Sequence, residues 1–136
     1  MTAATLLGAL IPERDPIKLL KTLRAGLPSM TLKRFKRATG LADEEIAELL
    51  GVGGRTLTRL KAAPRLPADL SDRLYAVVSV YALAERVFGD RATAIGWLGE
   101  PQFALQGRPP RQLLSTELGR HQVTGLLNQI EHGLLA

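Results

Sequence analysis

Residues that begin and end helices recur along the whole chain, and this pattern constrains its fold more than any other feature. Asp15 followed by Pro16 is typical of a helix N-terminus, because the carboxylate accepts a hydrogen bond from a free backbone N–H group and proline lacks one. Gly26, Gly40 and Gly51 each follow a segment with helical spacing of apolar residues, where glycine readily ends a helix. We find no convincing strand pattern and no internal repeat, so the sequence predicts an all-α fold.

The helices expected from this pattern account for most of the 136 residues. They span residues 16–25, 30–39, 43–50, 54–62, 68–88, 91–98 and 117–132, with one further helical turn at 110–114 and a loop at 99–108. Leucine and alanine are abundant and aromatic residues make up only 4%, which favours helix over sheet. In the first of these helices, Ile17, Leu20 and Leu23 form an apolar stripe.

The longest expected helix, 68–88, follows a proline-containing segment, 64–67, that we interpret as a domain boundary. The predicted domains are therefore 1–65 and 66–136. The middle of the long helix is apolar nearly all round, which indicates either burial within its own chain or contact with a second copy. Trp97 is interpreted as a core anchor against this helix, with direct contact to a partner as the alternative.

Positive charge is concentrated in the first predicted domain. Residues 1–65 contain 12 Lys and Arg against 6 Asp and Glu, whereas residues 66–136 contain 6 against 7. This asymmetry favours a polyanionic partner for the first domain. The alternative is a solvated basic face that binds nothing.

Residues 43–62 have the spacing of a helix-turn-helix. Ala47 is small where the second helix crosses close to the first, and Gly51 permits the positive φ of a tight turn. The remaining positions form a small apolar core made of Ile46, Leu50, Val52, Leu57 and Leu60. We expect this motif to bind DNA, and the alternative is a helical hairpin within a bundle. Ala42 departs from the pattern, because serine or threonine is usual at that capping position.

Helical spacing turns the polar side chains of the second helix outward when Leu57 and Leu60 face inward. Arg55, Thr58 and Arg59 would then face the major groove, where arginine suits guanine edges. Thr56 would cap the helix or contact a phosphate, and the basic residues of helix 30–39 would hold the DNA backbone without reading its sequence. The predicted DNA-binding residues are Lys33, Arg34, Lys36, Arg37, Arg55, Thr56, Thr58 and Arg59.

Several classes of function are disfavoured by what the sequence lacks. The chain has no cysteine, which excludes disulfides and cysteine-built metal sites. His121 and His132 lie 11 residues apart, about 16 Å along a helix, so they cannot share a metal ion within one chain. We identify no catalytic constellation and predict a binding protein rather than an enzyme, with no cofactor and no metal. No apolar run approaches the roughly 18 residues of a membrane span and no signal peptide is recognised, so we expect a cytoplasmic protein.

The second domain resembles a known family in the order of its motifs. These are Asp69-Leu70-Ser71-Asp72-Arg73-Leu74, Val87-Phe88-Gly89-Asp90, Ala94-Ile95-Gly96-Trp97-Leu98, Leu105-Gln106-Gly107-Arg108-Pro109-Pro110, Leu113-Leu114-Ser115-Thr116-Glu117-Leu118-Gly119 and Ile130-Glu131-His132-Gly133. Their order resembles the toxin-binding domain of the MbcA/ParS/Xre antitoxin family. With the preceding helix-turn-helix, which is then Xre-like, the resemblance covers about two thirds of the chain. Gln102-Phe103-Ala104 after Pro101 is a departure, because an asparagine is common there.

The resemblance implies a partner that is a RES-domain toxin, a protein that consumes NAD or transfers part of it. Antitoxins of this family lie over the NAD-binding cleft, so the implied mechanism is occlusion of the active site. The implied toxin-facing residues, on the last helix and the segment after it, are Thr116, Glu117, Arg120, Glu131, His132, Gly133, Leu134 and Leu135. Leu134 and Leu135 either dock on the toxin or fold back onto the chain's own core.

We therefore expect an antitoxin that also represses its own operon by binding double-stranded operator DNA as a homodimer. The alternative is a stand-alone helix-turn-helix transcriptional repressor with no toxin partner, whose second domain only dimerises. A third hypothesis is an adaptor that localises a partner and does not bind DNA.

Overall fold

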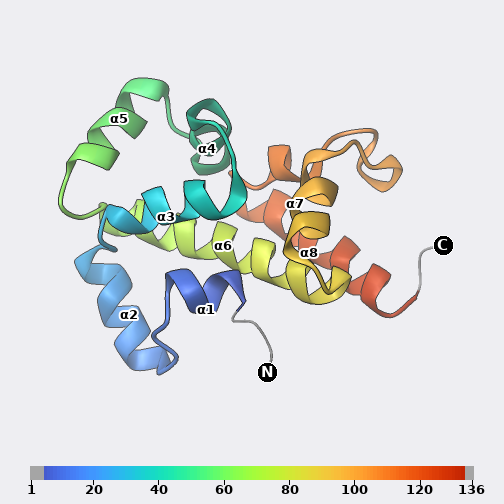
Figure 1. Ribbon diagram of the computed structural model, residues 1–136, viewed down its shortest axis with the longest axis horizontal. Helices are drawn as coiled ribbons and strands as arrows, with labels where there is room; N and C mark the ends of the chain where they lie inside the picture. The colour runs from blue at the N-terminus through green and yellow to red at the C-terminus, as the bar shows by residue number, and fades with distance from the viewer. Residues whose placement is uncertain (1–4, 134–136) are drawn as a thin grey trace.

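The computed structural model describes residues 5–133, which form eight α-helices and two short 3₁₀ helices with no β-strand among them (Figure 1). The α-helices are α1 (Leu6–Leu10), α2 (Pro16–Ala25), α3 (Met30–Thr39), α4 (Asp43–Leu50), α5 (Gly54–Ala62), α6 (Ala68–Phe88), α7 (Arg91–Gly99) and α8 (Glu117–Glu131). The 3₁₀ helices are η1 (Phe103–Leu105) and η2 (Pro110–Leu113). The all-α fold predicted from the sequence is confirmed.

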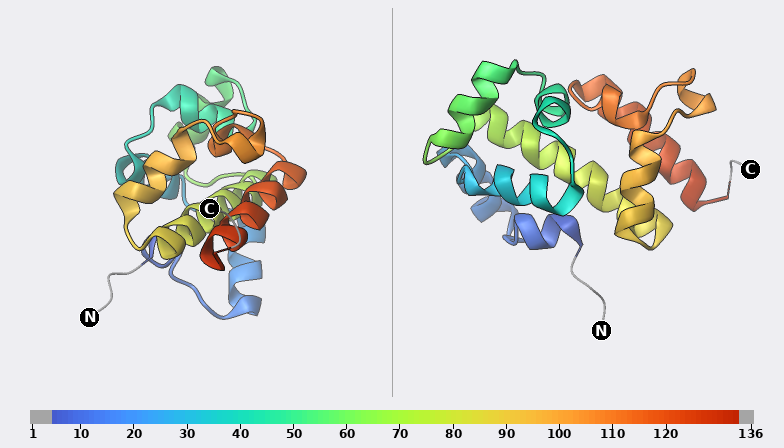
Figure 2. Two further views of the ribbon diagram at one scale, coloured as in Figure 1. Left: turned by 90° about the vertical axis from the view of Figure 1, so that its right-hand side faces the viewer. Right: turned by 45° about the horizontal axis from the view of Figure 1, so that its top comes forward.

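The central element is α6, around which the other helices are arranged (Figures 1 and 2). It packs against α1, α2 and α4 and against α7 and α8. Leu74, Val77 and Val78 are fully buried as a result. The apolar character of this helix is therefore explained by burial within its own chain, and contact with a second copy is not needed to account for it.

Capping contacts fix the helix ends where the sequence predicts them. The Asp15 carboxylate accepts a hydrogen bond from the Ile17 N–H group at 2.9 Å, which closes the first turn of α2. Gly40, Gly51 and Gly89 follow α3, α4 and α6 with φ of 71°, 67° and 74°, a left-handed conformation that glycine adopts without steric cost. The bounds of α2 to α6 consequently agree with those expected.

The structure differs from the expected elements in three places. Helix α1 was not expected, and it forms because buried Leu6 and Leu10 pack on the core while the Leu6 N–H group donates to Glu85 Oε1 at 2.8 Å. The segment expected to be a loop, 99–108, contains η1 and the last residue of α7. The apolar stripe on α2 is largely solvent-facing, because only Leu23 is buried whereas Ile17 and Leu20 are exposed.

The segment that we interpreted as a domain boundary is packed against the chain that precedes α3. The Leu66 N–H group donates to the Leu27 carbonyl at 2.8 Å, and Leu66 itself is buried. Gly26 lies so close to this segment that a Cβ atom there would be 2.2 Å from the Leu66 carbonyl oxygen. Residues 64–67 are therefore held by the fold, and the division into domains 1–65 and 66–136 stays a prediction.

Close packing also fixes α8 against η2. A Cβ atom on Gly119 would lie 1.7 Å from the Leu113 carbonyl oxygen, so only glycine allows this approach. Gly125, in the same helix, faces open space. Trp97 is half-buried and its ring packs against Phe88 with centroids 5.4 Å apart, which supports its interpretation as an anchor on α6.

Candidate DNA-binding and partner-binding surfaces

Helices α4 and α5 form the expected helix-turn-helix. The chain turns at Gly51 in its left-handed conformation, and the Val52 N–H group donates to the Ala47 carbonyl at 3.0 Å. Ala47 is buried at the crossing of the two helices, as its small size predicts. The side chains expected inside are Ile46, Leu50, Leu57 and Leu60, which are all buried, and Val52, which is half-buried.

The helix-turn-helix is tied to the second half of the chain by two arginines. Arg73 on α6 donates to the Leu50 carbonyl at 2.5 Å, which satisfies an otherwise free acceptor at the end of α4. Arg111 on η2 pairs with the Glu45 carboxylate at 2.8 Å. The same Glu45 accepts a hydrogen bond from the Ala42 N–H group at 2.8 Å, so the missing hydroxyl at Ala42 leaves this half of the cap intact.

The outward side of α5 carries the residues predicted to contact base edges. Arg55, Thr58 and Arg59 are exposed, while Thr56 is half-buried and accepts a hydrogen bond from the Arg59 guanidinium at 3.3 Å. Neither Arg55 nor Arg59 makes an ion pair with another residue in the range 5–133. These two cations consequently remain available to an anionic ligand.

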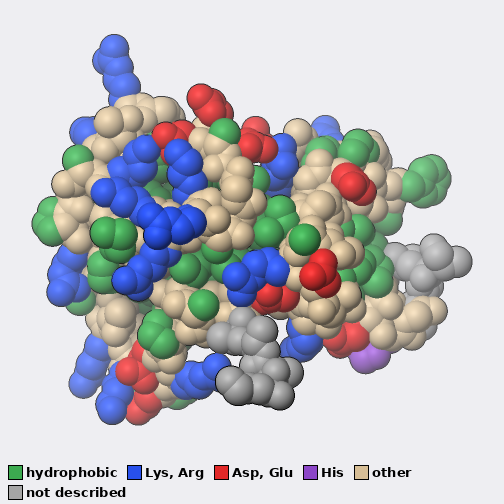
Figure 3. All heavy atoms as spheres, in the orientation of Figure 1, with side chains coloured by type: hydrophobic (Ala, Val, Ile, Leu, Met, Phe, Trp, Pro, Cys, Tyr) green, Lys and Arg blue, Asp and Glu red, His purple; other side chains and the backbone are tan. Residues whose placement is uncertain are grey.

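Helix α3 adds further positive charge beside α5, against which it packs. Lys33, Arg34 and Arg37 are exposed. The "basic surface" consists of Lys33, Arg34, Arg37, Arg55 and Arg59. Lys and Arg side chains gather over the part of the molecule that α3 and α5 form (Figure 3).

Lys36 differs from its neighbours on α3, because it is half-buried in a pair with Asp43. The Lys36 ammonium contacts one Asp43 oxygen at 2.9 Å and the Lys61 ammonium contacts the other at 2.8 Å. These two hydrogen bonds hold the pKa of the Asp43 carboxyl below its ordinary value of 3.8. Asp43 thus links α3, α4 and α5, and this internal role of Lys36 was not foreseen.

The predicted toxin-facing residues fall into two groups at opposite ends of α8. Thr116 caps the helix by accepting from the Gly119 N–H group at 3.0 Å, Glu117 lies 3.9 Å from His121, and Arg120 donates to the Leu114 carbonyl at 2.9 Å. Glu131 pairs with Arg86 at 3.4 Å at the far end, about 21 Å from Glu117 along the helix axis.

His132 and Gly133 follow the last turn of α8 and are exposed. Leu134 and Leu135 lie outside the described residues. The structure therefore does not bring the predicted residues to a single point, although they share one helix. The "α8 surface" consists of Thr116, Glu117, Arg120, Glu131, His132 and Gly133.

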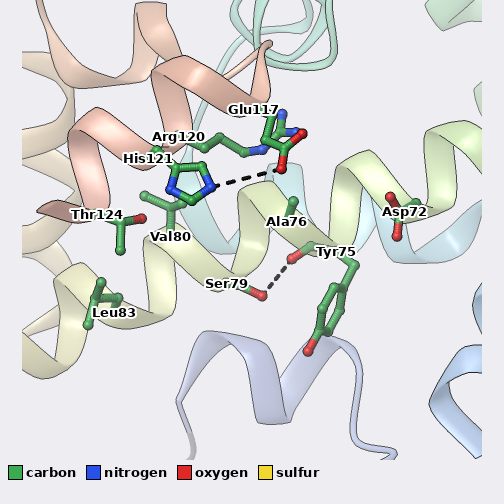
Figure 4. Close-up of a pocket in the computed structure, with 10 residues that line it drawn as sticks. All are labelled: Asp72, Tyr75, Ala76, Ser79, Val80, Leu83, Glu117, Arg120, His121 and Thr124. Carbon is green, nitrogen blue, oxygen red and sulfur yellow. Dashed lines mark hydrogen bonds and ion pairs between the residues drawn. The ribbon is translucent and has the colours of Figure 1, made fainter. Parts of the chain in front are cut away.

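A groove runs between the start of α8 and the middle of α6 (Figure 4). Glu117, Arg120 and His121 line it from α8, while the Tyr75 ring points away from them toward α1. The groove is open and its lining side chains are mainly polar or small. It extends the α8 surface toward α6 without forming an enclosed cavity.

Sequence reasoning missed two exposed apolar side chains in this half of the molecule. Phe103 on η1 is 101% exposed and Leu118 on α8 is 72% exposed. The available signal for Phe103 was its place in a short segment between Pro101 and Gly107, where a large aromatic residue is unusual. Its exposure depends on how that segment folds.

Residues 5–133 contain neither a membrane-spanning helix nor a cluster of metal-ligating side chains. No helix in this range has the length and apolar character to cross a membrane. No group of three or more Asp, Glu or His side chains there is arranged to hold a metal ion.

Two family profiles match the chain. The profile described as the antitoxin Xre-like helix-turn-helix domain matches residues 18–79, and the profile described as the antitoxin Xre/MbcA/ParS C-terminal toxin-binding domain matches residues 83–133. The first match extends past residue 65 into α6, in keeping with the packing of that helix on α1, α2 and α4.

Curated relatives named Antitoxin Xre are similar in sequence. One from Pseudomonas putida is 40% identical over 80 residues, which is 58% of this chain and 50% of the relative, so the match spans half the length of that protein. One from Yersinia enterocolitica is 29% identical over 128 residues, which is 93% of this chain and 86% of the relative. A chain in the crystal structure of the Mycobacterium tuberculosis MbcT–MbcA toxin–antitoxin complex has a similar fold, with a TM-score of 0.57 and 22% identity over 79% of this chain and 96% of that one.

Proposed function

Because this chain belongs to the Xre/MbcA/ParS family of antitoxins, we propose that it neutralises a partner toxin through its second half and binds DNA through α5. The observation that carries the DNA-binding part is the orientation of α5. Its buried Leu57 and Leu60 turn Arg55, Thr58 and Arg59 to the solvent, as a recognition helix requires. The toxin-binding part is supported by the match of residues 83–133 to a domain of that description.

In the proposed complex with DNA, α5 lies in the major groove. Arg55 and Arg59 reach base edges, where an arginine bonds two acceptors of guanine, and Thr58 lies between them. Lys33, Arg34 and Arg37 contact phosphates and fix the position of the protein on the duplex. Thr56 and Lys36 contribute less to DNA binding, because Thr56 is bonded to Arg59 and Lys36 is paired with Asp43.

The proposed partner is a RES-domain toxin that acts on NAD, and the proposed mechanism is coverage of its active site by the α8 surface and the residues that follow. The likeness to a chain from a toxin–antitoxin complex supports a fold suited to this role. We also propose that the chain represses its own operon as a homodimer, which would place two recognition helices about 34 Å apart on DNA. The proposal involves binding alone and no catalytic step.

A mobility-shift titration on the DNA upstream of the gene tests the DNA-binding part. The double variant Arg55→Ala/Arg59→Ala should bind at least tenfold more weakly, because each base contact contributes about 1–3 kcal/mol. Lys33→Ala should weaken binding to every sequence and reduce the slope of affinity against salt by about one unit. Arg108→Ala removes the same charge from an exposed position far from α5 and serves as the control. Unchanged binding by the double variant would contradict the recognition-helix assignment.

Co-expression with the product of the adjacent reading frame tests the toxin-binding part. A RES-domain protein encoded there should co-purify with the chain, and its growth inhibition should disappear in cells that contain both. If the chain retards the promoter fragment and no such protein co-purifies, a stand-alone repressor is favoured instead. Partner binding without DNA binding would favour the adaptor.

A further inference from the structure

Phe103 is the most exposed large apolar side chain among residues 5–133. Phenylalanine is one of the residues most often buried in folded proteins, and here the whole ring is in contact with water. Leu118, the next most exposed, lies at the start of α8 in the same half of the chain. Aromatic residues, phenylalanine among them, are enriched in the buried centre of protein–protein interfaces.

Backbone hydrogen bonds hold the segment that carries Phe103 in one conformation. Gln102 and Arg108 face each other in an antiparallel bridge, and the Gly107 N–H group donates to the Gln102 carbonyl at 2.9 Å. The Gln106 N–H group donates to the Phe103 carbonyl at 3.0 Å. The ring therefore projects from a closed turn rather than from a free chain.

The turn is also anchored to the body of the protein. The Gln102 side-chain amide donates to the Trp97 and Glu100 carbonyls, both at 3.2 Å, and half-buried Leu105 packs against the core. Gln106 adopts a left-handed conformation with φ of 60°, which is unfavourable for a residue other than glycine. Anchoring on both sides keeps this backbone conformation, so the turn has little backbone freedom to lose on binding.

The position of this turn relates it to the α8 surface. In Figures 1 and 2 the segment around η1 and the last turns of α8 lie at the same end of the molecule, and α5 lies at the other. The turn also falls within residues 83–133, which match the toxin-binding profile. A partner seated on the last turns of α8 would extend toward Phe103.

We propose that Phe103 is an anchor residue that inserts into an apolar pocket on the partner toxin, an inference that rests on the proposed function. The turn 102–108 presents the ring, and the polar side chains around it, Gln102, Gln106 and Arg108, form a rim that excludes water when the ring is buried. The toxin contact thus has two parts, the α8 surface and the Phe103 turn.

Equilibrium binding of the RES-domain protein from the adjacent reading frame, in an inactive variant, tests this inference. Phe103→Ala should weaken the affinity at least tenfold, and Phe103→Leu should restore part of the loss because it keeps apolar bulk. Ile17→Ala is the matched control, since Ile17 is also exposed but lies on α2 outside the toxin-binding profile. The thermal midpoint and the retardation of DNA should stay unchanged in all three variants, because these side chains lie outside the core.

The outcomes separate this inference from the proposed function. A wild-type chain that binds the toxin while Phe103→Ala binds equally well would overturn the anchor and leave the antitoxin assignment standing. A wild-type chain that does not bind would overturn both. Phe103→Ala could also change the oligomeric state, measured by light scattering, and leave the toxin affinity unaltered. That result would assign the ring to a contact between copies of the chain and would overturn the proposal.

Discussion

The two ends of this molecule present different chemistry to a ligand. At the α5 end, the arginines of the basic surface extend into solvent and make no ion pair with the described residues. At the other end, charges of the α8 surface are engaged within the chain, as in the pair of Glu131 with Arg86 and the hydrogen bond that Arg120 donates to the Leu114 carbonyl. The apolar ring of Phe103 is fully exposed there as well.

This difference indicates two modes of binding. Free cations attract a polyanion over several ångströms, and that attraction weakens as salt screens it. An apolar side chain on a closed turn acts only in contact and depends on the shape that presents it. We therefore expect the α5 end to respond to changes of charge and the α8 end to respond to changes of packing.

The largest effect is expected from a packing change at the α8 end. Gly119→Ala places a Cβ atom 1.7 Å from the Leu113 carbonyl oxygen, so α8 must move away from η2 at a cost of about 3 kcal/mol in the free energy of unfolding. Toxin affinity should fall at least tenfold at a temperature where the variant remains folded. DNA affinity should change less than twofold, measured by titration of the same sample.

Gly125→Ala is the matched control, because it adds the same methyl group to the same helix where no atom lies within 4 Å. It should raise the free energy of unfolding by about 1 kcal/mol, since alanine is the better helix former. If thermal denaturation showed an equal loss of stability in the two variants, the contact of α8 with η2 would not be what determines the stability of this end.

A smaller effect is expected from the ion pair that joins the two ends. Arg111→Met and Glu45→Gln each remove one charge of the 2.8 Å ion pair, and a double-mutant cycle should give a coupling of about 0.5–1 kcal/mol for this partly exposed pair. Neither DNA affinity nor toxin affinity should change more than about twofold. A tenfold loss of DNA affinity in Arg111→Met would instead show that packing at η2 controls the basic surface.

The smallest effect is expected at Asp43. Asp43→Asn removes the anion shared by Lys36 and Lys61 and should strengthen DNA binding by about twofold, with no effect on toxin binding. Folding lowers the pKa of the Asp43 carboxyl below its ordinary value of 3.8. The contribution of the carboxylate to stability is therefore complete above pH 3.8 and is lost as the pH falls through the lowered pKa. The difference in thermal midpoint between the wild type and Asp43→Asn should therefore vanish in acid, which a pH series of melts would check.

The sequence predicts the helices of this protein well because their ends are marked locally. Asp15, Gly40 and Gly89 act within one turn of the helix that each begins or ends, so neighbours in sequence suffice to place them. The inward and outward sides of α5 follow from the same periodicity, which is why the exposure of Arg55 and Arg59 agrees with expectation.

Features that depend on distant contacts escaped prediction. Helix α1 has five residues and is held by α6, so its own sequence contains little signal for it. The pairing of Lys36 with Asp43 and of Arg111 with Glu45 joins residues from different elements. The exposure of Phe103 depends on the turn that closes at Gln102 and Gly107, and apolar character alone suggests the opposite.

The central position of α6 restricts how such a protein can exchange parts with its relatives. A recombination event at residues 64–67 would bring in a foreign α6 and with it a foreign seat for α1 and α2, whose side chains are shaped to the original helix. Chimaeras joined after residue 88 would keep that seat but would place a foreign α7 and α8 on the original α6, against which both helices pack. An exchange at either position therefore divides the packing around α6, and a folded chimaera requires matched side chains on both sides of that helix.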